Sequence, residues 1–172
     1  RLGAHAVAAQ VPMGEEDHFW GVIDLVTMTA WDFKADDKGM TYPEPMDAIP
    51  DEFVDIVEER RAELLEAAAD YDDELMELVL EDEEIPVELL KKALRAGVLA
   101  NDLNLVFVGS AYKNKGVQEL LDAVVDYLPS PLDIPAITGI NPDTGAEEER
   151  KPSNKDPFAS LAFKIMTDPY VG

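Results

Sequence analysis

The sequence predicts a mixed α/β fold, and one stretch of it carries most of that prediction. Residues 105–108, Leu-Val-Phe-Val, are apolar and rich in β-branched and aromatic side chains, as in a buried strand. Residues 109–116 form a loop that begins and ends with glycine. A helix over 117–128 is predicted to pack one apolar stripe against a sheet. The stripe comprises Val117, Leu120, Leu121, Val124, Val125 and Leu128.

The loop over 109–116 is the predicted binding site, because ligands of open α/β sheets lie outside the carboxyl ends of strands. Gly109, Ser110 and Ala111 have small side chains, so their N–H groups are open to a flat ligand edge. The helix that follows favours negative charge at its N-terminus. A tight turn without a ligand is the simpler interpretation, since such a loop is a weak motif by itself.

A separate α+β segment is predicted before this stretch. Alternating apolar residues predict strands over 19–26 and 28–33, a turn at 36–39 and a short strand at 40–42. Three helices follow, over 50–70, over 73–80, and from Pro86 to a pause or end at Gly97. Their predicted apolar faces are Phe53, Val57, Leu64 and Ala68 in the first, Leu75, Met76, Leu78 and Val79 in the second, and Val87, Leu90 and Leu94 in the third.

The two ends of the chain have weaker patterns. Residues 1–4 resemble the end of a helix, and 6–12 predict a strand closed by Pro12 and Gly14. Residues 130–155 predict a connection with one short strand near 134–140, and 160–166 predict a half-buried strand. The missing initiator methionine and the strand-like final residues indicate a fragment of a longer protein.

Composition limits the function classes. The 172 residues include 37 acidic and 14 basic side chains, a net charge of −23. This net charge argues against binding of nucleic-acid backbones, because such binding depends on lysine and arginine. The remaining interpretations are a basic protein partner, a role in solubility alone, or a salt-adapted composition. The absence of cysteine excludes disulfides and thiolate metal sites and fits a cytoplasmic protein, and no apolar run is long enough to cross a membrane.

Residues 109–118, Gly-Ser-Ala-Tyr-Lys-Asn-Lys-Gly-Val-Gln, resemble the last guanine-nucleotide motif of the elongation factor G family of bacterial translational GTPases. Further matches occur in order along the chain. They are Arg-Leu-Gly-Ala at 1–4, Gly-Val-Ile-Asp-Leu-Val at 21–26, Asp-Tyr-Leu-Pro-Ser-Pro at 126–131, Leu-Ala-Phe-Lys-Ile at 161–165 and Asp-Pro-Tyr-Val-Gly at 168–172. Several separated matches are more specific than one short motif.

The resemblance implies the C-terminal part of a P-loop GTPase domain with an inserted α+β subdomain, followed by the first strands of a β-barrel domain. Residues 1–14 would be a helix end and a strand of the G domain, and residues 15–104 the insert. Residues 105–130 would supply the last strand, the guanine loop and its helix. Residues 131–172 would be a linker and the start of the barrel.

The resemblance also implies two binding sites. Ser110, Ala111 and Tyr112 would bind guanine, with the Ala111 N–H donating to the base O6, where adenine has an amino donor instead. The insert would face the ribosomal stalk protein, with Glu83, Glu84 and Glu88 as contacts. Ion pairs made by such exposed side chains would accelerate association more than they would stabilise the complex. A solvated acidic helix start is the alternative interpretation.

A phosphate-binding loop, Gly-x-x-x-x-Gly-Lys-Ser/Thr, is absent from the sequence. The fragment alone is therefore expected to lack catalytic residues, metal sites and tight binding of GTP or GDP. By resemblance, its parent would use GTP and Mg²⁺ to move tRNA and mRNA through the ribosome. Direct contact of this fragment with RNA is not expected. The alternatives are a ribosome-protection or release-factor GTPase, or an acidic protein-interaction module without nucleotide binding.

Overall fold

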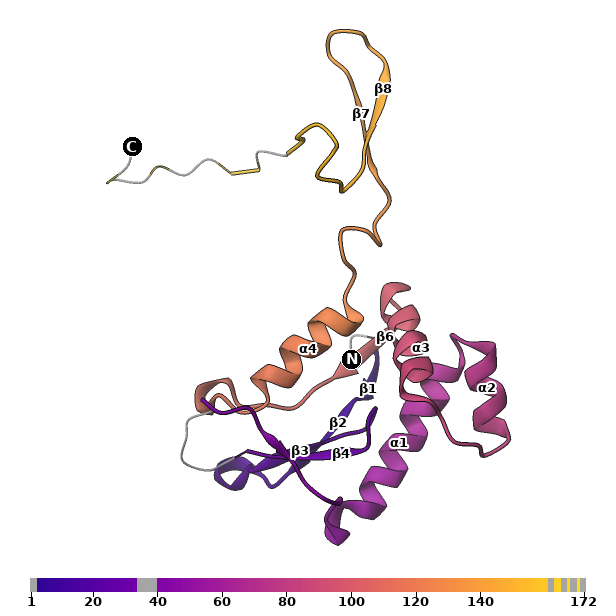
Figure 1. Ribbon diagram of the computed structural model, residues 1–172, viewed down its shortest axis with the longest axis vertical. Coiled ribbons are helices and arrows are strands. Elements are labelled where there is room, and N and C mark those ends of the chain that lie inside the picture. The colour runs from indigo at the N-terminus through magenta and orange to yellow at the C-terminus, as the bar shows by residue number, and fades with distance from the viewer. Residues whose placement is uncertain (1–2, 34–39, 161–162, 165–166, 168–169, 171–172) are drawn as a thin grey trace. The chain divides into compact units, whose positions relative to one another are not determined.

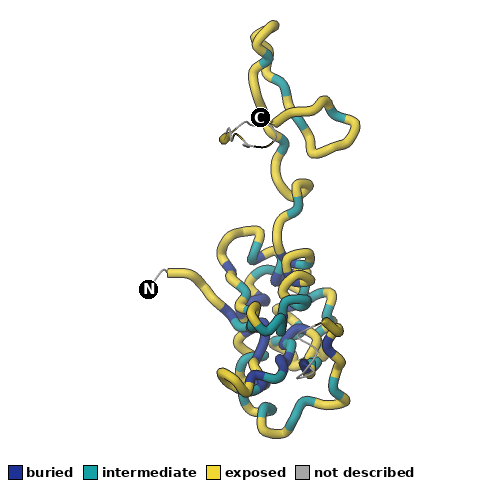
Figure 2. Tube along the Cα trace, turned by 90° about the vertical axis from the view of Figure 1, so that its left-hand side faces the viewer, coloured by how far each residue is buried: buried dark blue, intermediate teal, exposed yellow. Residues whose placement is uncertain are grey.

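The computed structural model describes residues 3–33, 40–160, 163–164, 167 and 170, and it confirms a mixed α/β fold (Figure 1). The chain divides into two units, Arg1–Leu128 and Pro129–Gly172. Every buried residue among those described belongs to the first unit (Figure 2). The predicted turn at 36–39 and parts of the predicted elements at 1–4 and 160–166 lie outside the described residues.

Two strands far apart in the sequence pair directly. β1 (His5–Ala8) runs parallel to β6 (Leu103–Val106), and Val7 lies opposite Leu105. The chain between them contains a second sheet and three helices. β6 begins and ends two residues earlier than the strand predicted at 105–108. Its burial is incomplete because β1 is its one partner strand in the described part of the chain.

The second sheet is antiparallel, in the order β2 (Gln10–Met13), β3 (Gly21–Asp24), β4 (Thr29–Asp32) and β5 (Glu44–Pro45). The strands predicted over 19–26 and 28–33 are present as β3 and β4, which pair as an antiparallel hairpin. The Asp24 carboxylate closes its turn by accepting the N–H groups of Val26 at 2.9 Å and Thr27 at 2.7 Å.

Two strand predictions in this region were wrong. The strand predicted over 6–12 is two strands, because the chain passes from the parallel pair to the antiparallel sheet at Ala9. Pro12 therefore lies inside β2, where an edge strand tolerates a residue without an N–H. The strand predicted at 40–42 lies instead at Glu44–Pro45, on the opposite edge.

Three helices pack beside one another in the first unit (Figure 1). α1 (Val54–Ala69) buries Val57, Leu64 and Ala68, as predicted. α2 (Asp73–Leu80) has the predicted bounds but buries Leu75 alone. Met76, predicted to be buried, is exposed, and Leu78 and Val79 are half-buried. Short α2 turns one face toward α1 and α3, so its other apolar side chains stay near the surface.

α3 (Val87–Leu99) continues through Gly97, although that glycine was predicted to interrupt or end it. A Cβ at Gly97 would lie 2.8 Å from Cε2 of Tyr71 and 3.0 Å from Cβ of Leu103. The glycine therefore serves close packing of α3 against its neighbours. Leu90 and Leu94 are buried as predicted.

α4 (Val117–Tyr127) has the predicted position, but its apolar stripe is not buried against a sheet. Its buried residues are Ala123 and Tyr127. The exposed fractions of the stripe are 47% for Leu120, 60% for Leu121, 44% for Val124, 79% for Val125 and 48% for Leu128. The two-stranded sheet is too narrow to cover this helix.

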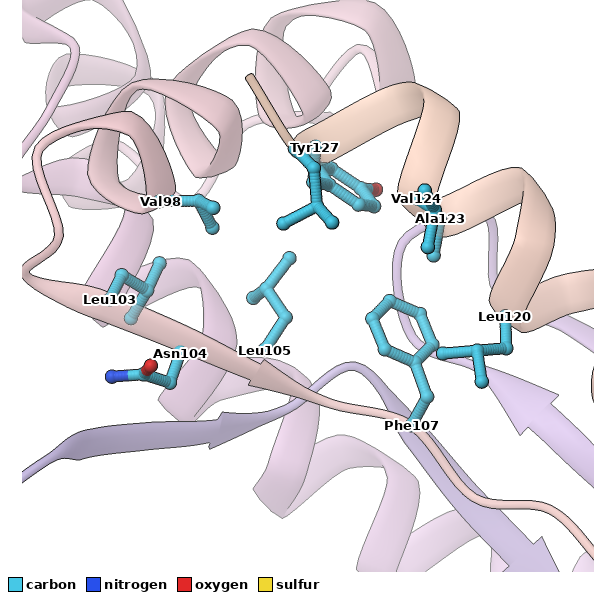
Figure 3. A pocket seen from close by; sticks show the side chains of 10 residues that line it. Val98, Leu103, Asn104, Leu105, Phe107, Leu120, Ala123, Val124 and Tyr127 are labelled. Atoms are coloured by element: carbon cyan, nitrogen blue, oxygen red, sulfur yellow. The ribbon is translucent and has the colours of Figure 1, made fainter. Parts of the chain in front are cut away.

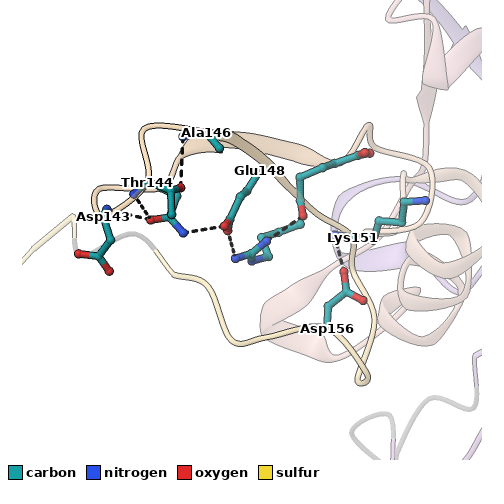
Figure 4. Close-up of polar contacts among 9 residues, drawn as sticks. Asp143, Thr144, Ala146, Glu148, Lys151 and Asp156 are labelled. Carbon is teal, nitrogen blue, oxygen red and sulfur yellow. Dashed lines mark hydrogen bonds and ion pairs between the residues drawn. The ribbon is translucent and has the colours of Figure 1, made fainter.

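The second unit contains a hairpin of β7 (Ile137–Ile140) and β8 (Glu147–Arg150), where a single short strand was predicted. Polar contacts hold its turn (Figure 4). Oδ1 of Asn141 accepts the Asp143 N–H at 2.8 Å, and its amide nitrogen donates to Glu148 at 2.7 Å. This bond and the ion pair with Arg150 hold the pKa of Glu148 below its usual value. Residues 163 and 164 are not in a strand.

Candidate functional site

The candidate loop lies directly after β6, at the carboxyl end of a parallel strand. Its two arms cross at Ser110 and Lys115, whose backbones exchange hydrogen bonds of 2.8 and 3.1 Å. A short 3-10 turn, Ala111–Lys113, forms the tip. α4 then begins after Gly116, which is left-handed with φ of 73°.

The two glycines of the loop are required by its own backbone. A Cβ at Gly109 would lie 2.9 Å from the carbonyl oxygen of Lys115, and one at Gly116 would lie 2.6 Å from that of Val108. The arms can approach this closely because both residues lack a side chain. Gly109, whose missing side chain was predicted to serve ligand access, thus has a structural role, as does Gly116.

The three predicted guanine-binding residues differ in what they offer a ligand. Ser110 is half-buried, and its N–H is already donated to Lys115. Ala111 is exposed, and its N–H has no hydrogen-bond partner among the described residues. The side chain of Tyr112 is fully exposed. Of the backbone donors at 110 and 111, the Ala111 N–H is therefore the one open to an acceptor.

The segment between β2 and β3 supports this loop through contacts that were not predicted from the sequence. Nζ of Lys115 donates to the carbonyl oxygen of Phe19 at 2.8 Å, and Nζ of Lys113 pairs with Asp17 at 3.0 Å. The hydrogen bond and the positive charge of Lys113 hold the pKa of Asp17 below its usual value. These partners are 96 residues apart in the chain, so no local pattern could have predicted them.

The predicted partner-contact residues lie where α2 connects to α3. Asp82 closes α2 in a left-handed conformation with φ of 55°, and the Glu83 N–H then donates back to Leu78 at 3.0 Å. Glu83, Glu84 and Glu88 are all exposed. None makes an ion pair within the part of the chain that the structure describes.

Residues of α4, β6 and α3 line an apolar cavity of about 220 Å³ (Figure 3). Leu120, Val124 and Tyr127 face Leu105 and Phe107 across it. The rings of Phe107 and Tyr127 lie 6.3 Å apart. The cavity accounts for part of the exposure of Leu120, Val124 and Leu128, whereas Leu121 and Val125 do not line it.

A group of carboxylates lies beside the same helix. Both carboxyl oxygens of Glu119 are buried without a hydrogen-bond partner among the described groups. Burial raises the pKa of Glu119, and the nearby carboxylates of Asp122 and Asp24 add to that effect. The Tyr42 hydroxyl donates to Asp122 at 2.7 Å, which raises the pKa of Tyr42 to about 12.

These acidic residues do not form a metal centre. In the described ranges, no three His, Asp or Glu side chains are placed to hold a metal ion. Over the same ranges, none of the helices combines the length and apolar character that crossing a membrane requires.

Comparison with known protein structures finds a relative of this fold. A crystal structure of a protein from Thermus thermophilus matches 78% of this chain with a TM-score of 0.62 and 27% identity. The chain spans 20% of the length of that protein. No family model matches the sequence. The chain is therefore a mixed α/β protein whose fold is related to part of a considerably longer one.

Proposed function

We propose that this chain is part of a translational GTPase of the elongation factor G type, and that residues 110–112 contact the guanine base of GTP or GDP. The observation that carries the proposal is the exposed N–H of Ala111, which has no partner among the described groups and follows the carboxyl end of β6. This is the end of a parallel strand at which α/β proteins bind ligands. The sequence motif over 109–118 supports the same assignment.

The chemistry of the base accounts for specificity. An N–H at residue 111 suits guanine, whose O6 is an acceptor, and opposes adenine, whose N6 is a donor. A mismatched pair leaves two desolvated donors facing each other, which costs about 1–3 kcal/mol for each unsatisfied group. The phosphates and Mg²⁺ would be bound by other parts of the parent protein. Hydrolysis, and the movement of tRNA and mRNA that it drives, are likewise proposed for the parent.

The length and surface of the chain support its assignment to a larger protein. The Thermus thermophilus structure that it resembles is several times longer. The apolar stripe of α4 also lacks a complete cover within the described residues. Both observations are expected if other segments of a GTPase pack here.

The experiment uses Ala111→Pro in the full-length protein, because proline removes the N–H without a bulky side chain. Ser110 is extended and Ala111 begins a helical turn, so the local backbone suits proline. We expect at least about tenfold weaker GDP binding, from the loss of one desolvated hydrogen bond. Binding of 2-aminopurine riboside diphosphate, which lacks O6, should not change.

Ala111→Gly, which retains the N–H, is the matched control and should bind GDP like the unchanged protein. Equal GDP affinity of the proline and glycine variants would remove residue 111 from the nucleotide site. Independently, the gene upstream of the codon for Arg1 should encode a phosphate-binding loop and an Asn-Lys-x-Asp motif.

A role in binding a basic protein is the second candidate function, favoured by the exposed cluster of Glu83, Glu84 and Glu88. We assign this cluster to contact with the ribosomal stalk protein.

A ribosome-protection or release-factor GTPase would have a similar nucleotide loop. Ribosome-dependent translocation of tRNA by the full-length protein distinguishes the proposed activity from these alternatives.

A further inference from the structure

The base of the candidate loop is fixed by the antiparallel sheet rather than by the loop alone. Val108, the residue before Gly109, packs against the small apolar cluster of Phe19, Val22 and Phe33. The rings of Phe19 and Phe33 lie 5.6 Å apart, edge to face. The segment between β6 and the loop therefore packs, at Val108, on an apolar cluster separate from the main core.

Lys115 connects the loop itself to that core. Its backbone exchanges two hydrogen bonds with Ser110, and its ammonium donates at 2.8 Å to the carbonyl oxygen of buried Phe19. The residue is half-buried, so this charged donor is partly shielded from water. The position of Ser110, and of the Ala111 N–H that follows it, thus depends on where Phe19 lies.

The second lysine contact is weaker. The Lys113 side chain is 37% exposed and that of Asp17 is 95% exposed. Exposed ion pairs contribute little and are screened by salt. Loss of the Lys115 ammonium is therefore expected to loosen the loop more than loss of the Lys113 ammonium.

We propose that Lys115 is a positioning residue, through which residues 17–19, between β2 and β3, set the geometry of the nucleotide loop and the rate of nucleotide release. A partner that displaces this segment would free the ammonium of Lys115, loosen the crossing at Ser110 and withdraw the Ala111 N–H from its ligand. The effect on nucleotide release, the regulatory half of this inference, rests on the proposed guanine site. The effect of Lys115 on the geometry of the loop, the mechanical half, does not.

The mechanical half is tested by amide hydrogen exchange on the 172-residue chain. Lys115→Met keeps the apolar stem and removes the ammonium, and it should accelerate exchange of the Ser110 amide at least about tenfold by opening the crossing locally. Lys113→Met should have a smaller effect that disappears in high salt, and exposed Lys155→Met should have none. Lys115→Arg, which restores a donor, should recover much of the protection.

Unchanged exchange at Ser110 in Lys115→Met, with native circular dichroism and an unchanged urea midpoint, would overturn the inference. If that variant fails to fold, Lys115→Arg and Lys113→Met still provide the comparison. Faster exchange throughout the chain in Lys115→Arg would likewise count against a local role.

The regulatory half is tested in the full-length protein by stopped-flow release of a fluorescent GDP analogue. We expect Lys115→Met to raise the dissociation rate about tenfold and to leave the association rate nearly unchanged, because most mutational changes in affinity act on the dissociation rate. An unchanged dissociation rate alongside faster Ser110 exchange would overturn this half. If the unchanged protein binds no guanine nucleotide, the proposed function fails, and the exchange result stands independently of it.

Discussion

The Val108 N–H donates at 3.1 Å to Oε1 of Gln10, a side chain that is 2% exposed and lies on the first strand of the antiparallel sheet. This bond joins the entrance of the candidate loop to a residue 98 positions earlier. The other end of the same amide, Nε2 of Gln10, is buried without a hydrogen-bond partner in the described part of the chain.

We predict that Gln10→Ala lowers the free energy of unfolding by about 1–3 kcal/mol, the typical effect of leaving a buried N–H unsatisfied. Urea denaturation measures this change, and the Val108 amide should lose protection from exchange. Retained protection at Val108 would show that another group accepts its N–H. Exposed Asn154→Ala is the control for loss of an amide side chain.

Gly97→Ala tests close packing within α3. Alanine should favour the helix by up to about 1 kcal/mol. Its Cβ would nevertheless lie 2.8 Å from the Tyr71 ring, and overpacking of a core costs about 1–3 kcal/mol. We expect net destabilisation in urea, reduced when Tyr71→Ala is added. Gly139→Ala, with no atom near its Cβ, should leave stability nearly unchanged.

Glu119→Gln tests the buried carboxyl beside α4. Its pKa in the folded chain is above the ordinary value of 4.5, so the native state binds this proton more tightly than the unfolded chain does. Its contribution to stability is therefore full below pH 4.5 and is lost as pH rises through the folded-state pKa. The glutamine variant should have a higher urea midpoint than the unchanged chain at about pH 7.

The advantage of Glu119→Gln should decrease as pH is lowered toward 4.5, because the unchanged side chain then becomes neutral as well. Exposed Glu66→Gln is the matched control for replacing a carboxylate by an amide. An equal difference at both pH values would contradict an effect of ionisation.

Leu64→Ala and Leu121→Ala form a matched pair for the two kinds of apolar helix position. Leu64 is fully buried, so its truncation should destabilise the chain by about 2–5 kcal/mol. Leu121 is 60% exposed, and its truncation should change stability by less than about 0.5 kcal/mol. A large loss at Leu121 in the isolated chain would indicate that α4 is covered in solution.

Charge reversal tests the cluster of Glu83, Glu84 and Glu88. Replacing all three by lysine in the full-length protein should lower ribosome-stimulated GTP turnover several-fold at low salt, because complementary charge accelerates association. The difference should diminish at high salt. Reversal of Glu58, Glu59 and Glu66 on α1 changes the net charge equally, and an identical loss there would exclude a specific contact.

The helices were the most predictable part of the chain. The spacing of Val57, Leu64 and Ala68 reports the buried face of α1 directly, and acidic residues precede or begin α1 and α2. A periodic pattern identifies an apolar face but does not report what covers it. For this reason the position of α4 was predicted correctly, whereas Leu121 and Val125, which were predicted to be buried, are exposed.

The strands and the supports of the loop were less predictable. No glycine, proline or charged residue marks the change of sheet at Ala9, so the two strands on either side look like one in the sequence. Gly97 and Gly109 are indistinguishable in sequence from helix-ending or ligand-facing glycines, although both are explained by close approach of neighbouring groups. The contact from Lys115 to Phe19 depends on tertiary structure alone.

The pairing of β1 with β6 also orders events on the ribosome that makes this chain. His5–Ala8 is synthesised well before Leu103–Val106, and at typical elongation rates of about 5–20 residues per second the delay is about 5–20 s. During that interval the antiparallel hairpin has time to fold, while the edge of β1 that pairs with β6 waits for its partner. Closure of the pair is therefore a late step, and the nascent chain has a period in which an unpaired strand edge is open to chaperones.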